Sequence, residues 1–187
     1  MKILSLHCDY IKFKPVKKAL KSAKELDKKE AEEKTVKEAL VILTAVEAGD
    51  SIAIVKNYIK NIEGIAAQVK AKNIVLYPYA HLSSKLSLPD VAESVMIEAE
   101  AELKKVGGFS VTRAPFGYYK EFELKCKGHP LAELSREIMA DNFEGKKTEE
   151  KYDAKQLLNH ISKSKLDTSK LKENDHRIIG QRLDLFS

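Results

Sequence analysis

The stretch EALVILTAVEAGDSIAIVKNYIKNIEGIAAQVKAKNIVLYPY, residues 38–79, carries the pattern that decides the fold. Residues 38–46 are apolar on both faces, which is typical of a central strand. Apolar side chains then recur every three or four residues as far as Val69, which predicts an amphipathic helix, and GDS at 49–51 supplies capping oxygens. A second apolar run, 73–79, reads as another strand. Strand, helix and strand in succession indicate an α/β layer fold.

The same alternation extends in both directions from this stretch. Upstream, two strands are expected to meet in a hairpin or sharp bend at Asp9, and the charged segment 16–35 is expected to be a solvated helical or mobile excursion. Downstream, a second helix, a β-hairpin with a Pro-Phe-Gly turn and a last helix beginning near Pro130 are expected. The predicted fold is a mixed β-sheet with packed helices. The two upstream strands are 2–8 and 10–16, the second helix has its apolar positions between Ala92 and Val106, the hairpin strands are 109–113 and 118–127, and the last helix covers HPLAELSREIM.

Length and composition predict one domain with a tail. The chain has 187 residues, of which 43% are hydrophobic, enough for one core of ordinary size. Periodicity weakens after residue 141, so we place the domain at 1–143 and a linker at 144–173. No run approaches the roughly 18 apolar residues of a membrane span, and Asp9 comes too early for a signal peptide. We therefore expect a soluble protein of the cytoplasm.

The charge of the chain permits an RNA partner without demonstrating one. The formal net charge is +5, but 28 acidic residues are interspersed with 33 basic ones. The two cysteines, Cys8 and Cys126, lie in strand-like apolar runs and are expected to be reduced, buried thiols.

One lysine breaks the alternation of the strand at 118–127. Tyr118, Phe122, Leu124 and Cys126 share one face, and Lys120 falls on this otherwise apolar face. A buried ammonium is unfavourable by several kcal/mol unless an anion or strong acceptors meet it. It could extend to the sheet edge or pair with a carboxylate such as Glu133. Alternatively, its charge could be held for a ligand oxyanion or an attacking water.

Other polar groups leave similar alternatives open. His81, followed by Ser83 and Ser84, is either a hydrogen-bonded histidine at a strand end or a site residue. Glu133 is either a carboxylate stabilised by the dipole of the last helix or a catalytic group. The cluster His7-Cys8-Asp9 lies at another strand end.

The motifs of several common sites are absent. Cys126 and His129 have the spacing of a metal-binding pair, but zinc needs about four ligands and no second compact pair exists, so no metal site is predicted. The sequence has no Gly-x-Ser-x-Gly elbow, no Walker loop and no dinucleotide fingerprint. These absences argue against a serine hydrolase and a nucleotide-triphosphate site.

Three longer motifs carry a resemblance to a known family. They are HCDYI at 7–11, YPYAHLSSKLSLP at 77–89 and APFGYYKEFELKCKGHPLAELSR at 114–136. Together they resemble the N-terminal editing domain of archaeal threonyl-tRNA synthetases, over residues 1 to about 140. The resemblance implies a fold like that of D-aminoacyl-tRNA deacylases. The segment NDHRIIGQRLDLF is similar to the opening of the class II catalytic region, which would occupy 174–187 in truncated form.

The resemblance implies hydrolysis of L-serine from mischarged seryl-tRNA(Thr), with the tRNA 2′-hydroxyl helping to activate water. It makes Lys120 the leading catalytic residue, His81 and Glu133 its supporting residues, and the backbone of Tyr119 a further contact. It implies no cofactor for editing, since ATP and zinc would belong to the missing catalytic domain. The implied partners are the 3′ end of threonine tRNA carrying serine, the remainder of the synthetase and a second copy in a homodimer, with no membrane. A non-catalytic tRNA-binding or dimerisation module and a D-aminoacyl-tRNA deacylase remain alternatives. The expected walls of the site are Ala45, Val46, Glu47, Tyr77, Pro78, Tyr79, Ala80, Pro115, Phe116 and Gly117.

Overall fold

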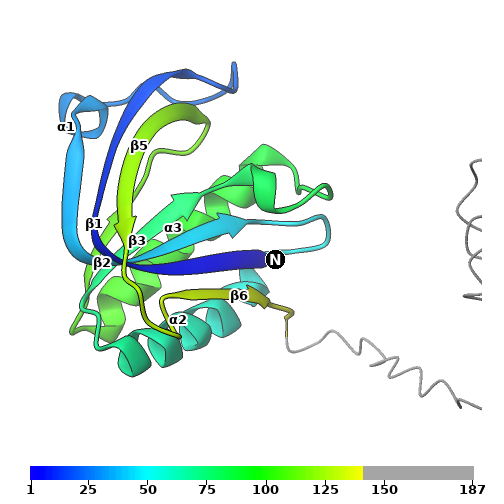
Figure 1. Cartoon of the computed structure of the whole chain (residues 1–187). Coiled ribbons are helices and arrows are strands. Elements are labelled where there is room, and N and C mark those ends of the chain that lie inside the picture. Colours follow the sequence, from blue (N-terminus) through cyan, green and yellow to red (C-terminus); the bar gives the residue numbers. More distant parts are fainter. Residues whose placement is uncertain (141–187) are drawn as a thin grey trace, which may run out of the picture. The chain divides into compact units, whose positions relative to one another are not determined.

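Residues 1–140 are described by a computed structural model, in which helices pack against a mixed β-sheet (Figure 1). The predictions for 144–173 and 174–187 lie outside these residues. The elements are, in chain order, β1 Lys2–Lys18, α1 Lys28–Ala31, β2 Lys34–Ala45, the 3-10 turn η1 Ile52–Ile54, α2 Val55–Val69, β3 Asn73–Pro78, the 3-10 turn η2 Ala80–Leu82, α3 Pro89–Val106, β4 Ser110–Arg113, β5 Tyr118–Cys126 and β6 Glu133–Glu137.

The long strand β1 is the centre of the sheet's pairing. The strand order is β4-β3-β2-β1-β5, and β6 also pairs with β1. Strands β2, β3 and β4 are parallel to one another, whereas β1 is antiparallel to β2, β5 and β6. The α/β fold with a mixed sheet that the sequence predicts is therefore confirmed.

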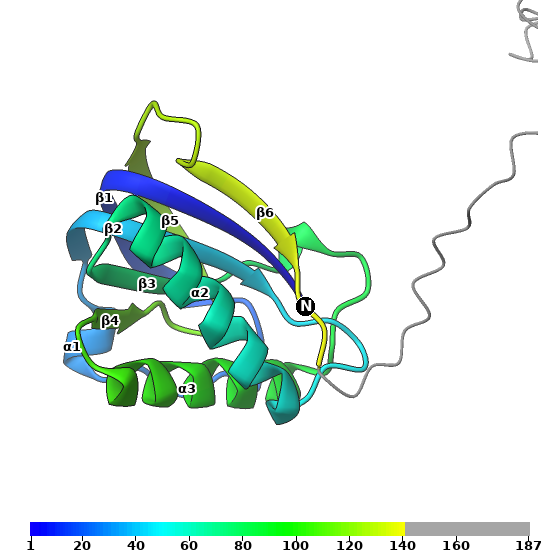
Figure 2. The same ribbon diagram turned by 90° about the horizontal axis from the view of Figure 1, so that it is seen from below.

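Helices α2 and α3 cover one face of the sheet, and Figure 2 shows them side by side across the strands. Alternate residues of β2 and β3 face this layer, including Leu40, Ile42 and Ile74, which are almost fully buried. Tyr58 of α2 is also buried, and its hydroxyl lies 2.6 Å from that of Thr44. The intervening side chains form a second core on the opposite face of the sheet.

Of the two alternatives at Asp9, the hairpin is wrong, because β1 runs unbroken through this residue. The sharp bend is confirmed, since β1 changes direction between the part that pairs with β6 and the part that pairs with β5 (Figure 1). A bulge between Cys8 and Tyr10 shifts the register against β5. An extra residue in a strand moves each later side chain to the opposite face from the one that simple alternation predicts. Accordingly, Leu6 and Cys8 before the bulge and Ile11 after it face the same core.

Two further predictions fail because strand partners are distant in the sequence. The segment 109–127 is not a hairpin, since β4 pairs with β3 and β5 pairs with β1, at opposite ends of the strand order. The prediction of a last helix beginning near Pro130 is also wrong. Glu133–Glu137 forms β6, which pairs with Lys2–Leu6 and so satisfies backbone groups of β1 that β5 does not reach.

The charged segment 16–35 has no buried residue, as expected of a solvated excursion, but parts of it are regular secondary structure. Strand β1 continues to Lys18, and the short helix α1 begins at Lys28, after the N-cap residue Asp27, which forms a capping box with Glu30. Ser51 precedes η1 without a side-chain capping bond, so the capping expected of GDS is also wrong. Asp50 instead accepts a hydrogen bond from the backbone of Glu47.

Candidate active site

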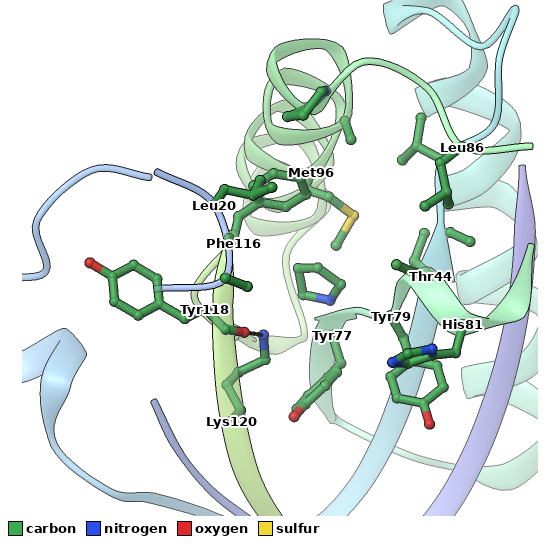
Figure 3. A pocket seen from close by; sticks show the side chains of 18 of the residues that line it. Leu20, Thr44, Tyr77, Tyr79, His81, Leu86, Met96, Phe116, Tyr118 and Lys120 are labelled. Atoms are coloured by element: carbon green, nitrogen blue, oxygen red, sulfur yellow. Dashed lines mark hydrogen bonds between the residues drawn. The ribbon is translucent and has the colours of Figure 1, made fainter. Parts of the chain in front are cut away.

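A cavity of about 420 Å³ lies where β2 and β3 end. In open α/β sheets, ligands bind at the carboxyl ends of parallel strands. The other walls come from the loop after β1, from η2, from the first turns of α3, and from the turn leading into β5 (Figure 3). The cavity is lined by these residues expected from the sequence: Ala45, Val46, Tyr77, Pro78, Tyr79, Ala80, His81, Phe116, Gly117, Tyr119 and Lys120.

Lys120 points into this cavity from β5, as its place in the alternation requires. Its Nζ donates hydrogen bonds to the carbonyl oxygens of Pro115, at 3.0 Å, and Tyr118, at 2.9 Å. Within residues 1–140 no carboxylate forms a salt bridge with it. The pairing with Glu133 and the extension to the sheet edge are thus both replaced by a third arrangement, in which neutral acceptors hold the ammonium.

Burial lowers the pKa of Lys120 from 10.5 to about 8. Removing an ammonium from water disfavours its charged form, and no neighbouring anion offsets this effect here. The side chain therefore carries its proton at neutral pH but releases it far more readily than a surface lysine.

An aromatic floor lies beneath the ammonium. The Nζ of Lys120 is 5.1 Å from the centroid of the Tyr77 ring, a cation–π distance. The Tyr77 ring is itself held edge-on by Phe13 at 5.9 Å and by Phe122 at 5.6 Å. Burial raises the pKa of Tyr77, so its hydroxyl stays protonated under ordinary conditions.

His81 and Tyr79 form the wall that faces Lys120 across the floor (Figure 3). The centroids of the two rings are 5.3 Å apart, and the ring planes are inclined at 67°. His81 is exposed, and it belongs to the turn η2 directly after β3. The structure thus brings Lys120 and His81 to one cavity from different elements.

The Pro-Phe-Gly turn shapes the rim of the cavity through Gly117. Its φ is +73°, in the region that favours glycine, and a Cβ there would meet the Cβ of Ala23 at 2.8 Å. Its carbonyl accepts hydrogen bonds from the backbone N–H groups of Ala19 and Leu20. The turn therefore fixes the loop after β1 against the cavity.

Three of the expected site residues do not line the cavity. Pro115 is buried and contributes only its carbonyl, to Lys120. The carboxylate of Glu47 accepts a hydrogen bond from Ser83 at 2.5 Å and pairs with the N-terminal ammonium at 3.3 Å. Although burial opposes ionisation of Glu47, these two partners outweigh it and lower its pKa.

Glu133 is separated from Lys120 along β1. It pairs with Leu6, whereas Lys120 pairs with Pro15. The stretch of β1 between these two positions is up to about 30 Å long at the usual rise per residue of an extended strand. Because Glu133 stands on a strand, its interpretation as a carboxylate stabilised by a helix dipole is wrong.

Several lining residues have no sequence signal. Ala19 and Leu20 come from the segment that composition marks as solvated, and Met96 is an ordinary core position of α3 that also reaches the cavity. The hydrogen bonds to Gly117 show that the loop after β1 belongs to the site.

The other polar cluster lies at a different part of β1. His7 Nδ1 and His129 Nε2 are 2.9 Å apart, and Cys8 is directly opposite Cys126. Both thiols are free, and burial raises the pKa of Cys8 to about 12. Among residues 1–140, no group of three or more His, Cys, Asp or Glu side chains is placed to hold a metal ion. Nor does any helix there have the length and apolar character needed to cross a membrane.

Comparison with known proteins decides the family. The model of the archaea-specific editing domain of threonyl-tRNA synthetase matches residues 1–138. This chain belongs to that editing-domain family. The relationship indicated by the three sequence motifs is thereby confirmed, and the cavity of the editing domain lies wholly within the matched residues.

Relatives of the editing domain include archaeal proteins named threonine–tRNA ligase. One from Thermococcus sibiricus is 48% identical over 153 residues, covering 80% of this chain and 24% of that protein. Another, from Methanobrevibacter smithii, is 47% identical over 156 residues, covering 81% of this chain and 25% of that protein. The chain thus spans about a quarter of the length of these relatives.

A solved structure shares the fold of the editing domain. The c-Myc DNA Unwinding Element Binding Protein superposes with a TM-score of 0.55 at 11% identity, covering 75% of this chain and all of that one. At this identity the likeness concerns the fold alone.

Proposed function

We propose that this editing domain hydrolyses L-serine from seryl-tRNA(Thr), and that the aminoacylated 3′ end of the tRNA enters the cavity beside Lys120. The observation that carries the proposal is the ammonium of Lys120, which two carbonyl oxygens hold inside a largely apolar cavity without a carboxylate partner in the described chain. Such a charge is positioned by its neighbours but not neutralised by them. It is therefore available to an oxyanion that forms during reaction.

The proposed reaction is ester hydrolysis, which requires no cofactor. Water attacks the carbonyl carbon of the seryl ester, and the negative charge that develops on the carbonyl oxygen is stabilised by Lys120. The ester C–O bond then breaks, releasing serine and a tRNA with a free ribose hydroxyl. The neighbouring 2′-hydroxyl helps to activate the water, and His81 supports the substrate from the facing wall.

A separate hydrolytic site would help because serine and threonine are difficult to distinguish by binding alone. Serine differs from threonine by one methyl group, and a missing contact of that size provides only about 1–3 kcal/mol of discrimination. Hydrolysis of seryl-tRNA supplies a second selection step. Threonyl-tRNA would be spared because its additional methyl group clashes in the cavity or displaces the water from a productive position.

The proposed setting is the one implied by the family. The domain would act in the cytoplasm as part of a threonyl-tRNA synthetase, with the tRNA and the rest of the synthetase as partners and a second copy in a homodimer. The curated relatives named threonine–tRNA ligase support the part of this setting that concerns the synthetase.

The test measures release of serine and threonine from the corresponding aminoacyl-tRNA(Thr) by this chain. We expect faster release of serine, and a loss of about 100- to 1,000-fold in kcat for Lys120→Met. The matched control is Lys125→Met, which changes an exposed lysine of the same strand. Equal release of serine and threonine, or an unimpaired and folded Lys120→Met variant, would contradict the proposal.

The same assay distinguishes the alternatives. Faster release of D-serine than of L-serine would instead identify a D-aminoacyl-tRNA deacylase. Affinity for tRNA without turnover would identify a binding module.

A further inference from the structure

The end of β1 and the loop that follows it form an unusually basic surface. Residues 10–24 contain six lysines and no acidic residue, whereas residues 25–34 contain five acidic residues. Overall composition, in which charges of both signs alternate, conceals this separation.

Three of these six lysines have a carboxylate as their partner or as their neighbour across the sheet. Lys12 pairs with Glu33 at 3.2 Å and Lys18 pairs with Glu25, while Lys14 forms no salt bridge but lies opposite Glu121 in the sheet. By contrast, no salt bridge within residues 1–140 involves Lys17, Lys21 or Lys24, which are all exposed. We call these last three the lysine rim.

The lysine rim adjoins the cavity and is tied to it. Ala19 and Leu20, between Lys17 and Lys21, line the cavity, and both donate backbone hydrogen bonds to Gly117. The hydroxyl of Tyr118 donates to the carbonyl oxygen of Lys24 at 2.7 Å. The loop is thereby held in place at the mouth of the cavity.

Exposed aromatic rings accompany the lysine rim. Tyr119 is 58% exposed, and the Nζ of Lys17 lies 5.5 Å from the centroid of its ring. Phe122, which also lines the cavity, is 45% exposed. Basic groups that follow a backbone and aromatic rings on which bases stack are the usual features of a single-stranded nucleic-acid surface.

We infer that the lysine rim binds the phosphates of the single-stranded RNA segment that precedes the terminal nucleoside. This inference rests on the proposed function, which places the aminoacylated end in the cavity. A cavity of about 420 Å³ is within the range that holds one small ligand, so it accommodates the terminal nucleoside and its amino acid. The preceding nucleotides must cross the rim, where Lys17 and Tyr119 meet phosphate and base.

The experiment measures binding of the 187-residue chain to an RNA hairpin that carries no amino acid and ends in the single-stranded 3′ sequence of threonine tRNA. The test variant is Lys17→Gln with Lys21→Gln and Lys24→Gln. The control variant removes the same charge from exposed lysines elsewhere, by Lys56→Gln, Lys60→Gln and Lys72→Gln. Affinity is measured from low to high salt.

Loss of three phosphate contacts should weaken binding by about 10- to 100-fold and reduce the slope of log K against log salt by about 2, as expected for single strands. The control variant should bind like the wild type. Equal affinity and equal slope in the two triple variants would overturn the inference. So would stronger competition from an acidic peptide than from a single-stranded RNA of the same charge.

A kinetic comparison separates this inference from the proposed function. The test variant should show a raised KM for seryl-tRNA with little change in kcat, and unchanged hydrolysis of seryl-adenosine, which lacks the preceding phosphates. An equal loss on both substrates would refute the phosphate contact. If no substrate is hydrolysed by the wild type, the proposed function fails, while the binding comparison still decides whether the lysine rim holds RNA.

Discussion

Replacing Lys120 by methionine should change the stability of the folded domain in a way that depends on pH. The side chain is held in the cavity with its pKa lowered from 10.5 to about 8 by burial. A tenfold loss of proton affinity corresponds to about 1.4 kcal/mol, so keeping the ammonium charged at pH 7 disfavours the folded state by about 3 kcal/mol. Methionine fills similar space without a charge.

The number of protons bound by the folded and unfolded chains sets the direction in which stability changes with pH. Between pH 8 and 10.5 the unfolded chain holds a proton on Lys120 that the folded chain has released, so the contribution of this group to stability rises with pH. The penalty is fully present below about pH 8 and is relieved towards pH 10.5. The variant lacks this pH-dependent contribution.

At neutral pH, two opposing effects set the stability difference. Removing the charge favours the variant by about 3 kcal/mol, whereas losing two hydrogen bonds, each worth about 1 kcal/mol, offsets much of this gain. We therefore expect Lys120→Met to be at least as stable as the wild type at pH 7. Its advantage should fall by about 3 kcal/mol between pH 8 and 10.5.

Urea unfolding followed by far-ultraviolet circular dichroism at several values between pH 7 and 10.5 measures this difference. All other lysines and tyrosines titrate in both proteins, so their contributions cancel in the comparison. Lys125→Met provides the control, because its side chain is exposed on the other face of β5. A stability difference between wild type and Lys120→Met that does not vary with pH would refute the conclusion that burial has weakened proton binding at Lys120.

Three further outcomes follow from the site. After subtraction of spontaneous hydrolysis, kcat for seryl-tRNA should fall as pH rises through about 8, since Lys120 then loses its proton; a pH profile without this limb would exclude the ammonium as the active form. Tyr77→Phe should retain kcat because the ring face persists, whereas Tyr77→Leu should reduce kcat by about 5- to 30-fold through loss of a cation–π contact worth about 1–2 kcal/mol; equal kinetics of the two variants would show that the ring is not needed. Gly117→Ala should destabilise the domain by about 1–3 kcal/mol in urea unfolding, because φ is positive and Ala23 is too close, while Gly64→Ala in an open helical position should stabilise it by about 0.5–1 kcal/mol; the reverse order would contradict the geometry of the turn.

Local periodicity predicts the individual strands and helices better than their partners. The alternation around Lys120 is confirmed, because in a strand with one partly covered face every second residue faces the same side. The pairing of Glu133–Glu137 with the start of β1 depends on residues more than 120 positions away, so a helical pattern in the same segment could mislead. At Asp9 the sequence indicates an irregularity, a hairpin or bend, but does not show that a single strand continues through it with a bulge.

The site is foreseeable where it depends on one strand and not where several elements meet. Lys120 is conspicuous as a charge on an apolar face, and its carbonyl partners come from the adjacent turn. The loop holding Ala19 and Leu20 is held at the cavity by hydrogen bonds to a distant turn, two of which Gly117 accepts. No property of the loop sequence itself records that contact.

A second lysine of the same domain clarifies what is special about the first. Lys127 contacts Asp9 at 2.7 Å and Glu38 at 2.9 Å, and its hydrogen bonds to these carboxylates raise its pKa. Its charge is thus neutralised within the fold and serves to join strands. Lys120 is bound by carbonyl dipoles and an aromatic ring instead, which fix its position without neutralising its net charge, while burial lowers its pKa. An incoming anion would supply the negative charge that Lys120 lacks, whereas Lys127 already has two carboxylate partners. The proposed chemistry is therefore assigned to Lys120.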